Sequence, residues 1–274
     1  MTVGNKRGNH ERILDIKNLT KYFGGLCAVS EFDMAVPRGG LYGLIGPNGA
    51  GKTTVFNVVT GLYEPSEGEI LFRGEDLVGM DPPVITRAGI ARTFQNIRLF
   101  QNLTVLDNVR VAYHTHAGYG LLESITRLGR FRRQENALTQ RAQEFLDVFG
   151  LYDRRAEMAK NLPYGEQRRL EIARALATEP RLLLLDEPAA GMNPHETEEL
   201  MELIHFVRDE FDLTILLIEH QMRVIMGICE WITVMDFGKV IARGTAQDIQ
   251  NDERVIEAYL GRKERRLRSD AAGS

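Results

Sequence analysis

A glycine-rich segment, GPNGAGKTT at residues 46–54, holds the residues best suited to chemistry in this sequence. It matches the pattern G-x-x-x-x-G-K-[ST] in full, between a short apolar run and a segment with helical spacing. In such a loop the glycines let the backbone wrap around phosphate oxygens, and the N-terminus of the following helix faces the negative charge. The pattern predicts a site for a nucleoside triphosphate and Mg²⁺. Its predicted binding residues are Gly46, Pro47, Asn48, Gly49, Ala50, Gly51, Lys52, Thr53 and Thr54.

Within this loop, two side chains have specific predicted tasks. Lys52 can reach the β- and γ-phosphates, and Thr53 supplies a hydroxyl for Mg²⁺. These two tasks indicate binding of the triphosphate but do not by themselves indicate its hydrolysis.

An acidic pair follows the apolar run at residues 182–185, which consists of four leucines. A buried strand of this kind presents an acid at its end, where Asp186 suits the coordination shell of Mg²⁺. Glu187 is placed to take a proton from an attacking water, and such general-base assistance is typically worth ~10²–10⁴-fold in rate. The simpler alternative is an acidic cap at the end of a strand or helix.

The elements that must position these residues alternate between strands and helices. The predicted strands span residues 13–36 (two strands around a turn at 23–25), 41–45, 69–73, 88–94, 181–185 and 213–218, with a hairpin at 231–244. The predicted helices span residues 53–60, 137–148 and 165–177, and residues 113–136 form a loose Gly- and Arg-rich stretch. The apolar runs at 181–185 and 213–218 are typical of parallel strands buried on both faces. This pattern predicts an α/β sheet core with a helical lobe.

Composition excludes several classes of protein. A chain of 274 residues with net charge −4 is one large domain or one domain with lobes, and it does not suggest a nucleic-acid binder. Cys27 and Cys229 are no disulfide framework, and we expect both to be buried core thiols in a reducing compartment. The polar start is not a signal peptide, and no run approaches the ~18 apolar residues of a membrane span. We therefore expect a cytosolic protein whose membrane contact goes through a partner or a surface patch.

With GPNGAGKTT, LLLLDEP and a loop that opens a helix between them, the chain resembles an ABC-type ATPase over roughly residues 12–260. The resemblance implies ATP and Mg²⁺ as cofactors. Phe23 looks like the aromatic residue that stacks on adenine, although the neighbouring Tyr22 is an alternative. Gln95 is similar to the glutamine that touches Mg²⁺ or the attacking water, and His220 to the histidine that faces the γ-phosphate. The expected catalytic residues are thus Lys52, Gln95, Glu187 and His220, and the expected metal-binding residues are Thr53, Gln95 and Asp186.

The resemblance also implies a fold and its boundaries. The implied fold is a RecA-like P-loop ATPase of the α/β class, with a mostly parallel core sheet, an antiparallel β subdomain and a helical subdomain. We expect a mobile N-terminus at residues 1–11, one domain at 12–260 with the helical subdomain at about 100–178, and a basic polar tail at 261–274.

The segment LPYGEQ at residues 162–167 is similar to the family signature, usually LSGGQ. In this family two ATPase chains pack head to tail, and the signature of one contacts the γ-phosphate held by the other. Pro163 replaces the usual serine and removes a hydroxyl donor, whereas Gly165 still lets backbone N–H groups approach. We expect Pro163, Gly165 and Gln167 to contact the ATP of a partner, in a weakened but functional signature supported by the helix dipole. A second departure is Asn193, where the family usually carries aspartate.

Several longer segments, among them YGEQRRLEIARALA, DEPAAGMNP and ARTFQNIRLFQNLTVLDNV, resemble the ATP-binding subunits of branched-chain amino-acid importers. That resemblance implies transmembrane permease subunits, a second ATPase subunit (a sister chain or a second copy) and, indirectly, an external substrate-binding protein. It places the chain peripherally on the cytoplasmic face of the inner membrane, with no nucleic-acid partner. The alternatives are a urea or short-amide importer, a lipopolysaccharide exporter, a soluble ABC ATPase and a regulator that does not hydrolyse.

A few features have simpler explanations. The triplet DFG at residues 236–238 is explained by a hairpin turn. His114 and His116 are expected to be loop histidines rather than metal ligands. The basic stretches at 127–133 and 262–268 are expected to be solvated, with contact to anionic lipid as the alternative.

Overall fold

The computed structural model describes residues 11–113 and 128–259, except for the side chains of residues 128–134. The expectations for the N-terminus, for His114 and His116, and for the basic tail therefore lie outside the described residues. Among the helices described, none is both long enough and apolar enough to cross a membrane.

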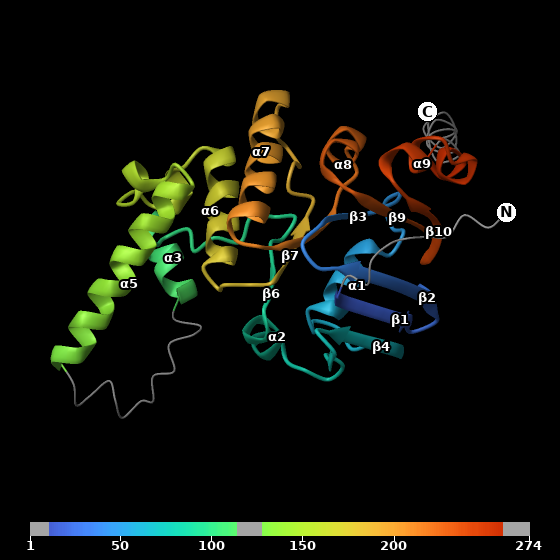
Figure 1. Cartoon of the computed structure of the whole chain (residues 1–274), viewed down its shortest axis with the longest axis horizontal. Coiled ribbons are helices and arrows are strands. Elements are labelled where there is room, and N and C mark those ends of the chain that lie inside the picture. The colour runs from blue at the N-terminus through green and yellow to red at the C-terminus, as the bar shows by residue number, and fades with distance from the viewer. Residues whose placement is uncertain (1–10, 114–127, 260–274) are drawn as a thin grey trace, which may run out of the picture.

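A six-stranded sheet forms the centre of the molecule, in the order β10-β9-β3-β8-β7-β6 (Figure 1). Its strands are β3 (Leu41–Ile45), β6 (Ile90–Arg92), β7 (Leu182–Asp186), β8 (Thr214–Ile218), β9 (Trp231–Asp236) and β10 (Lys239–Gly244). All pairs are parallel except that of β9 with β10, which forms the predicted hairpin. Along β7 the leucines alternate: Leu182 and Leu184 face one apolar cluster, Leu183 and Leu185 the other. The prediction of strands buried on both faces is confirmed.

A smaller antiparallel sheet covers one side of the centre, in the order β2-β1-β4-β5. It consists of β1 (Arg12–Phe23), β2 (Leu26–Pro37), β4 (Glu67–Phe72) and β5 (Glu75–Asp76). The helix α1 (Lys52–Val59) shares one buried apolar cluster with strands of both sheets. The end of β3 and the start of α1 are therefore held firmly from two sides, and the glycine-rich loop lies between them.

Helices cover the other face of the central sheet, and some of them lie beyond one edge of the sheet (Figure 1). They are α3 (Val105–Tyr113), α5 (Leu128–Val148), α6 (Tyr164–Leu176), α7 (Pro194–Glu210), α8 (Met222–Ile228) and α9 (Ala246–Gln250). The helix α3 packs against both α5 and α6, and short 3-10 turns at Tyr152–Arg154 and Ala159–Asn161 lead into α6. The α/β class with a mostly parallel core sheet, an antiparallel β unit and a helical part is thus confirmed.

Three sequence-based expectations were wrong in part. Residues 128–136 are helical rather than loose, because arginine, glutamine and glutamate are good helix formers and the charge of this segment does not oppose a helix. The strand predicted at 88–94 is only Ile90–Arg92, because α2 (Pro82–Ala88) precedes it and ends at Gly89 in the left-handed conformation. Cys229 is buried, but Cys27 is only half-buried and donates its thiol to the Val29 carbonyl oxygen at 3.3 Å.

Candidate functional site

The glycine-rich loop connects β3 to α1 and fits closely against neighbouring backbone. A Cβ atom on Gly46 would lie 2.0 Å from the carbonyl oxygen of Met235, at the end of β9, and Gly46 has a positive φ. A Cβ atom on Gly51 would lie 2.5 Å from the carbonyl oxygen of Ala28. Any side chain at these two positions would displace the loop, so the glycines are required by close packing as well as by the space a phosphate needs.

Lys52, the first residue of α1, is buried within this loop. Its Nζ donates to the carbonyl oxygens of Gly46 at 2.7 Å and Pro47 at 3.1 Å. Asn48 and Gly49 are exposed at the loop tip, Ala50 is buried, and Thr53 is exposed beside the half-buried Thr54. The ammonium group is therefore held at the centre of the loop, with the Thr53 hydroxyl free to meet a metal ion.

A hollow of about 250 Å³ opens beside the loop. Its lining residues are Leu26, Cys27, Ala28, Gly49, Ala50, Gly51, Lys52, Thr53, Thr54, Phe237 and Gly238. A hollow lined by glycine backbone, a lysine and a helix N-terminus has the chemistry that polyphosphate requires. The residues present therefore fit a nucleoside triphosphate.

Phe23 lies near this hollow without lining it. Its ring is exposed at the end of β1 and contacts Tyr63 edge to face, with ring centroids 5.2 Å apart. The Nζ of Lys21 lies 5.2 Å from the same ring. Tyr22 is exposed as well, so both candidate adenine platforms keep part of their aromatic surface open to solvent.

Asp186 ends β7 as predicted and is almost fully buried. Its Oδ2 pairs at 2.7 Å with Arg92, which also donates to the Asn57 side chain at 2.7 Å. This arginine was not predicted from the sequence. It provides the positive charge that a buried carboxylate needs. Arg92 follows a two-residue apolar run at the end of a very short strand, so no local pattern indicated its partner.

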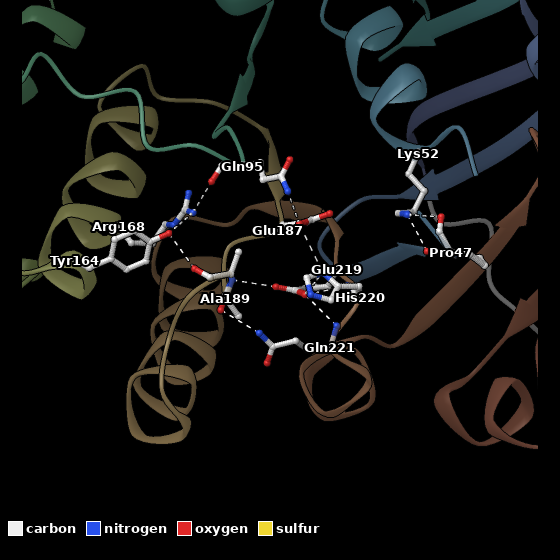
Figure 2. A network of polar contacts seen from close by, with 12 residues as sticks. Pro47, Lys52, Gln95, Tyr164, Arg168, Glu187, Ala189, Glu219, His220 and Gln221 are labelled. Atoms are coloured by element: carbon white, nitrogen blue, oxygen red, sulfur yellow. Dashed lines mark hydrogen bonds and ion pairs between the residues drawn. The ribbon is translucent and has the colours of Figure 1, made fainter. Parts of the chain in front are cut away.

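Glu187, Gln95 and His220 meet in space although they are far apart in the sequence (Figure 2). The Nε2 of Gln95 donates to Glu187 Oε2 at 2.8 Å, and His220 Nδ1 lies 3.5 Å from the same oxygen. Glu187 has a positive φ of 46°, a conformation that is unfavourable for a side chain of this size and that recurs at functional sites. The structure thus brings together three of the four expected catalytic residues around one carboxylate oxygen.

Glu219 holds the histidine in place and was also missed from sequence. Its side chain is fully buried; Oε1 accepts from the Ala189 N–H at 2.9 Å, and Oε2 accepts from the His220 N–H at 2.8 Å. The side chain of Gln221 closes the ring by donating to the Ala189 carbonyl oxygen at 3.0 Å (Figure 2). Glu219 follows the apolar run at 213–218 just as Asp186 follows the leucines. This similarity is the sequence feature that could have indicated Glu219 as a site residue.

A metal ion would be held here by few protein ligands. Among the described residues, no group of three or more histidine, cysteine or carboxylate side chains could hold one. In nucleotide sites Mg²⁺ is typically bound by one or two protein groups together with phosphates and waters. The Thr53 hydroxyl and the Asp186 carboxylate fit that requirement.

The signature-like segment lies away from the glycine-rich loop: Figure 2 shows Tyr164 and Lys52 at opposite ends of the polar network. Pro163 is the N-cap residue of α6 and makes no side-chain capping bond. Tyr164 donates its hydroxyl to the Ala190 carbonyl oxygen at 2.9 Å, and Gln167 turns inward to donate to the Leu162 carbonyl oxygen at 2.8 Å. The structure does not bring Pro163, Gly165 or Gln167 to the Lys52 site of the same chain.

Asn193 has a clear structural task. Its Oδ1 accepts from the N–H groups of His195 at 2.9 Å and Glu196 at 3.0 Å, and Glu196 accepts from the Asn193 N–H at 2.9 Å. These bonds form a complete capping box at the start of α7. Asparagine here satisfies helix donors as well as an aspartate would.

Comparison with known proteins supplies independent findings. A family model described as "ABC transporter" matches residues 29–190, and one described as "Branched-chain amino acid ATP-binding cassette transporter" matches residues 239–265. The chain is 47% identical over 249 residues, 91% of this chain and 98% of the relative, to the high-affinity branched-chain amino acid transport ATP-binding protein LivG of Escherichia coli (strain K12). It is 45% identical, with the same coverage, to the corresponding protein BraF of Pseudomonas aeruginosa. A crystal structure of an ATP-binding cassette of an ABC transporter, in its ADP conformation, superposes with a TM-score of 0.80 at 30% identity, covering 91% of this chain and 99% of that one.

Proposed function

Because this chain belongs to the ABC transporter family, whose ATP-binding subunits hydrolyse ATP, we propose that it drives an importer of branched-chain amino acids. The catalytic part of this proposal depends on one observation above all: Gln95, Glu187 and His220 converge beside Asp186. The cargo is supported by the match at residues 239–265 and by the similarity to LivG and BraF, which are branched-chain amino acid transport ATP-binding proteins.

In the proposed reaction the glycine-rich loop holds the triphosphate. Its backbone N–H groups and the N-terminus of α1 bind phosphate oxygens, and Lys52 moves its Nζ from the loop carbonyls to the β- and γ-phosphates. Thr53 and Asp186 would hold Mg²⁺, and Gln95 would contact it or the water. When bound, Mg²⁺ neutralises charge that develops on the transferred phosphoryl group. Phe23 or Tyr22 provides a face for the adenine ring.

Glu187 takes the proton of the attacking water. Its Oε2 already accepts a hydrogen bond from Gln95 and lies 3.5 Å from His220. Gln95 orients the carboxylate or the water, and His220 faces the γ-phosphate. Glu219 fixes the backbone N–H of His220, so the imidazole starts from a backbone position that is held in place.

A second ATPase chain completes each site in this proposal. Tyr164, in the segment that holds Pro163, Gly165 and Gln167, lies across the view from Lys52 of the same chain (Figure 2). This separation is expected if the segment serves the ATP of a partner packed head to tail. The partner is a sister ATPase or a second copy, and both stand on permease subunits at the cytoplasmic face of the inner membrane. An external binding protein delivers the amino acid, and no nucleic acid takes part.

Uptake in source cells whose only copy carries Lys52→Ala tests this function. Losing a charged contact to phosphate costs at least about tenfold in rate, so uptake of labelled leucine, isoleucine and valine is expected to fall by that factor or more. Urea and other amino acids are expected to enter normally. Lys17→Ala, which changes an exposed lysine of β1 paired with Glu69, serves as the control. Unchanged branched-chain uptake, or loss of urea uptake instead, would show that the cargo is different.

A further inference from the structure

The helix α6 carries a buried ion pair that the reaction described above does not use. Arg168 and Glu171 have side chains that are 0% and 1% exposed, and Arg168 Nη1 lies 2.6 Å from Glu171 Oε2. Removing two charges from water is costly unless their remaining polar atoms are also satisfied. The contacts of those atoms therefore indicate what the pair is for.

The pair binds the backbone of residues 94–98, the irregular segment that contains Gln95. Arg168 donates to the carbonyl oxygens of Phe94 at 2.9 Å and Gln95 at 3.0 Å. Glu171 Oε1 accepts from the N–H groups of Arg98 at 3.1 Å and Phe94 at 3.4 Å. We call these four hydrogen bonds and the ion pair the Arg168–Glu171 clamp. The clamp fixes the segment at both ends to the middle of α6 through charge-assisted bonds, which are stronger than neutral ones.

On its other side the same segment contacts Glu187 directly and Asp186 indirectly, through Arg92. The Gln95 side chain donates to Glu187 at 2.8 Å. The Phe94 ring lies 4.9 Å from the guanidinium of Arg92, which pairs with Asp186 at 2.7 Å. Residues 94–98 therefore lie between α6 and the acids, and any movement of α6 must move them or break the clamp.

The N-terminal end of α6 is the signature-like segment. Arg168 is one turn from Tyr164, whose hydroxyl binds the Ala190 carbonyl oxygen three residues after Glu187. A guanidinium that bonds two adjacent carbonyls cannot slide along the segment without losing both bonds, and an unmade buried bond is costly. A displacement of this helix end would therefore reach Gln95 through Arg168, which Figure 2 shows bonded to it.

We propose that Arg168 and Glu171 are positioning residues that tie Gln95 to the signature helix, so that occupation of the signature end of α6 sets the Gln95–Glu187 contact in the same chain. ATP held by a partner would thereby switch the hydrolytic site of this chain. This inference rests on the roles proposed above for Gln95, Glu187 and the signature segment, but it does not depend on the cargo.

A double-mutant cycle on ATP hydrolysis by the assembled transporter tests the clamp. Arg168→Lys keeps the charge but cannot bond both carbonyls and Glu171 in the same geometry. It is expected to lower kcat by about 2–30-fold, the range in which residues along a coupling route act. In a Gln95→Ala background the same change is expected to lower kcat by less than about twofold, because contacting residues that act through one another are not additive. The neighbouring Arg169→Lys, on the same helix but exposed and paired with Glu199, is expected to leave kcat unchanged in both backgrounds.

The outcomes separate this inference from the proposed function. If Arg168→Lys lowers kcat equally in both backgrounds, the arginine supports the fold only and the clamp is refuted, while the role of Gln95 stands. If Gln95→Ala alone leaves kcat unchanged, the role of Gln95 and the clamp both fail.

A second variant guards against a trivial loss of folding. Glu171→Gln keeps a side-chain oxygen and nearly the same shape but removes the charge of the pair. Because this change leaves the buried Arg168 charge without its partner, the thermal midpoint is expected to fall while unfolding stays cooperative. Well below that midpoint, amide exchange at Phe94 and Arg98 is expected to be faster by about tenfold relative to amides of the central sheet, whereas Arg169→Lys leaves this exchange as it is. If exchange and kcat both stay at wild-type values in Glu171→Gln and Arg168→Lys, residues 94–98 are held by other contacts and the clamp is overturned.

Discussion

At the scale of single residues, the unusual backbone conformation of Glu187 determines where its carboxylate lies. Glu187 holds a positive φ, and its N–H donates to the carbonyl oxygen of Ile218, at the end of the neighbouring strand, at 2.9 Å. That bond turns the side chain towards Gln95 and His220. Strain of this kind persists only where the surroundings fix it, and here β7, β8 and Glu219 do so.

Glu187→Gln is expected to separate ATP binding from hydrolysis. The amide keeps the volume of the side chain but cannot take a proton, so turnover is expected to fall by about 10²–10⁴-fold. ATP binding is expected to remain, since the glycine-rich loop and Lys52 are unchanged. Single-turnover hydrolysis and equilibrium nucleotide binding measure the two effects. Glu230→Gln, an exposed glutamate paired with Arg208, is the control; turnover of Glu187→Gln within twofold of wild type would exclude Glu187 as the base.

Site residues that belong to a contiguous sequence motif can be predicted from the sequence alone. Lys52, Asp186 and Glu187 each lie in a motif with its own flanking strand, so local order alone indicated their places. Arg92 and Glu219 could not be assigned in the same way, because their partners come from other strands and are chosen by the packing of the sheet. The stacking of adenine on Phe23, with Tyr22 as the alternative, stays a prediction.

At the scale of secondary-structure elements, strands were predicted better than helices. Buried strands such as β7 and β8 are short, wholly apolar runs, and such runs are easy to recognise between turn residues. The charged start of α5 has no apolar stripe that marks it as a helix. The helix α7 illustrates a further difficulty: its N-cap residue, Asn193, lies in a loop that the family resemblance describes as functional.

Asn193→Ala is expected to destabilise the start of α7. The alanine removes both capping bonds, and losing such a cap costs about 0.5–2 kcal/mol of the free energy of unfolding. Asn193→Asp is expected to leave the free energy of unfolding within a few tenths of a kcal/mol of the wild-type value, because aspartate caps a helix as well as asparagine does. Denaturant unfolding of the three proteins measures this difference. An alanine variant as stable as wild type would mean that the capping box contributes nothing.

At the scale of the whole molecule, the glycine-rich loop and the signature end of α6 lie on different parts of the same domain. The glycine-rich loop, Glu187 and His220 follow the carboxyl ends of the parallel strands β3, β7 and β8, where α/β sheets place their ligands. The signature end of α6 lies to the side, next to the start of α7. A chain built in this way separates the glycine-rich loop from Gly165, which agrees with the proposal that a complete site needs two chains.

Gly165→Ala tests whether the site is shared between two chains, because the variant should be more stable against unfolding but should associate less well in the presence of ATP. A Cβ atom on Gly165 would lie 3.4 Å from Glu196 Oε1, an ordinary contact with the end of a flexible side chain. Because Gly165 lies within α6, alanine is expected to raise the free energy of unfolding by up to about 1 kcal/mol. The same methyl group would stand where the γ-phosphate of a partner's ATP must approach the helix backbone, so ATP-dependent association should weaken.

Sedimentation velocity with ATP and Mg²⁺, in a Glu187→Gln background that retains bound ATP, measures this association with the sister chain or with a second copy. Gly227→Ala is a matched control, because Gly227 also lies within a helix and its added Cβ atom would meet Met201 Sδ at 3.4 Å. If Gly165→Ala associates as well as Gly227→Ala does, the signature end of α6 does not face a partner's ATP. If both variants lose association together with stability, the effect belongs to the fold. Only a stable Gly165→Ala chain that fails to associate agrees with a site shared between two chains.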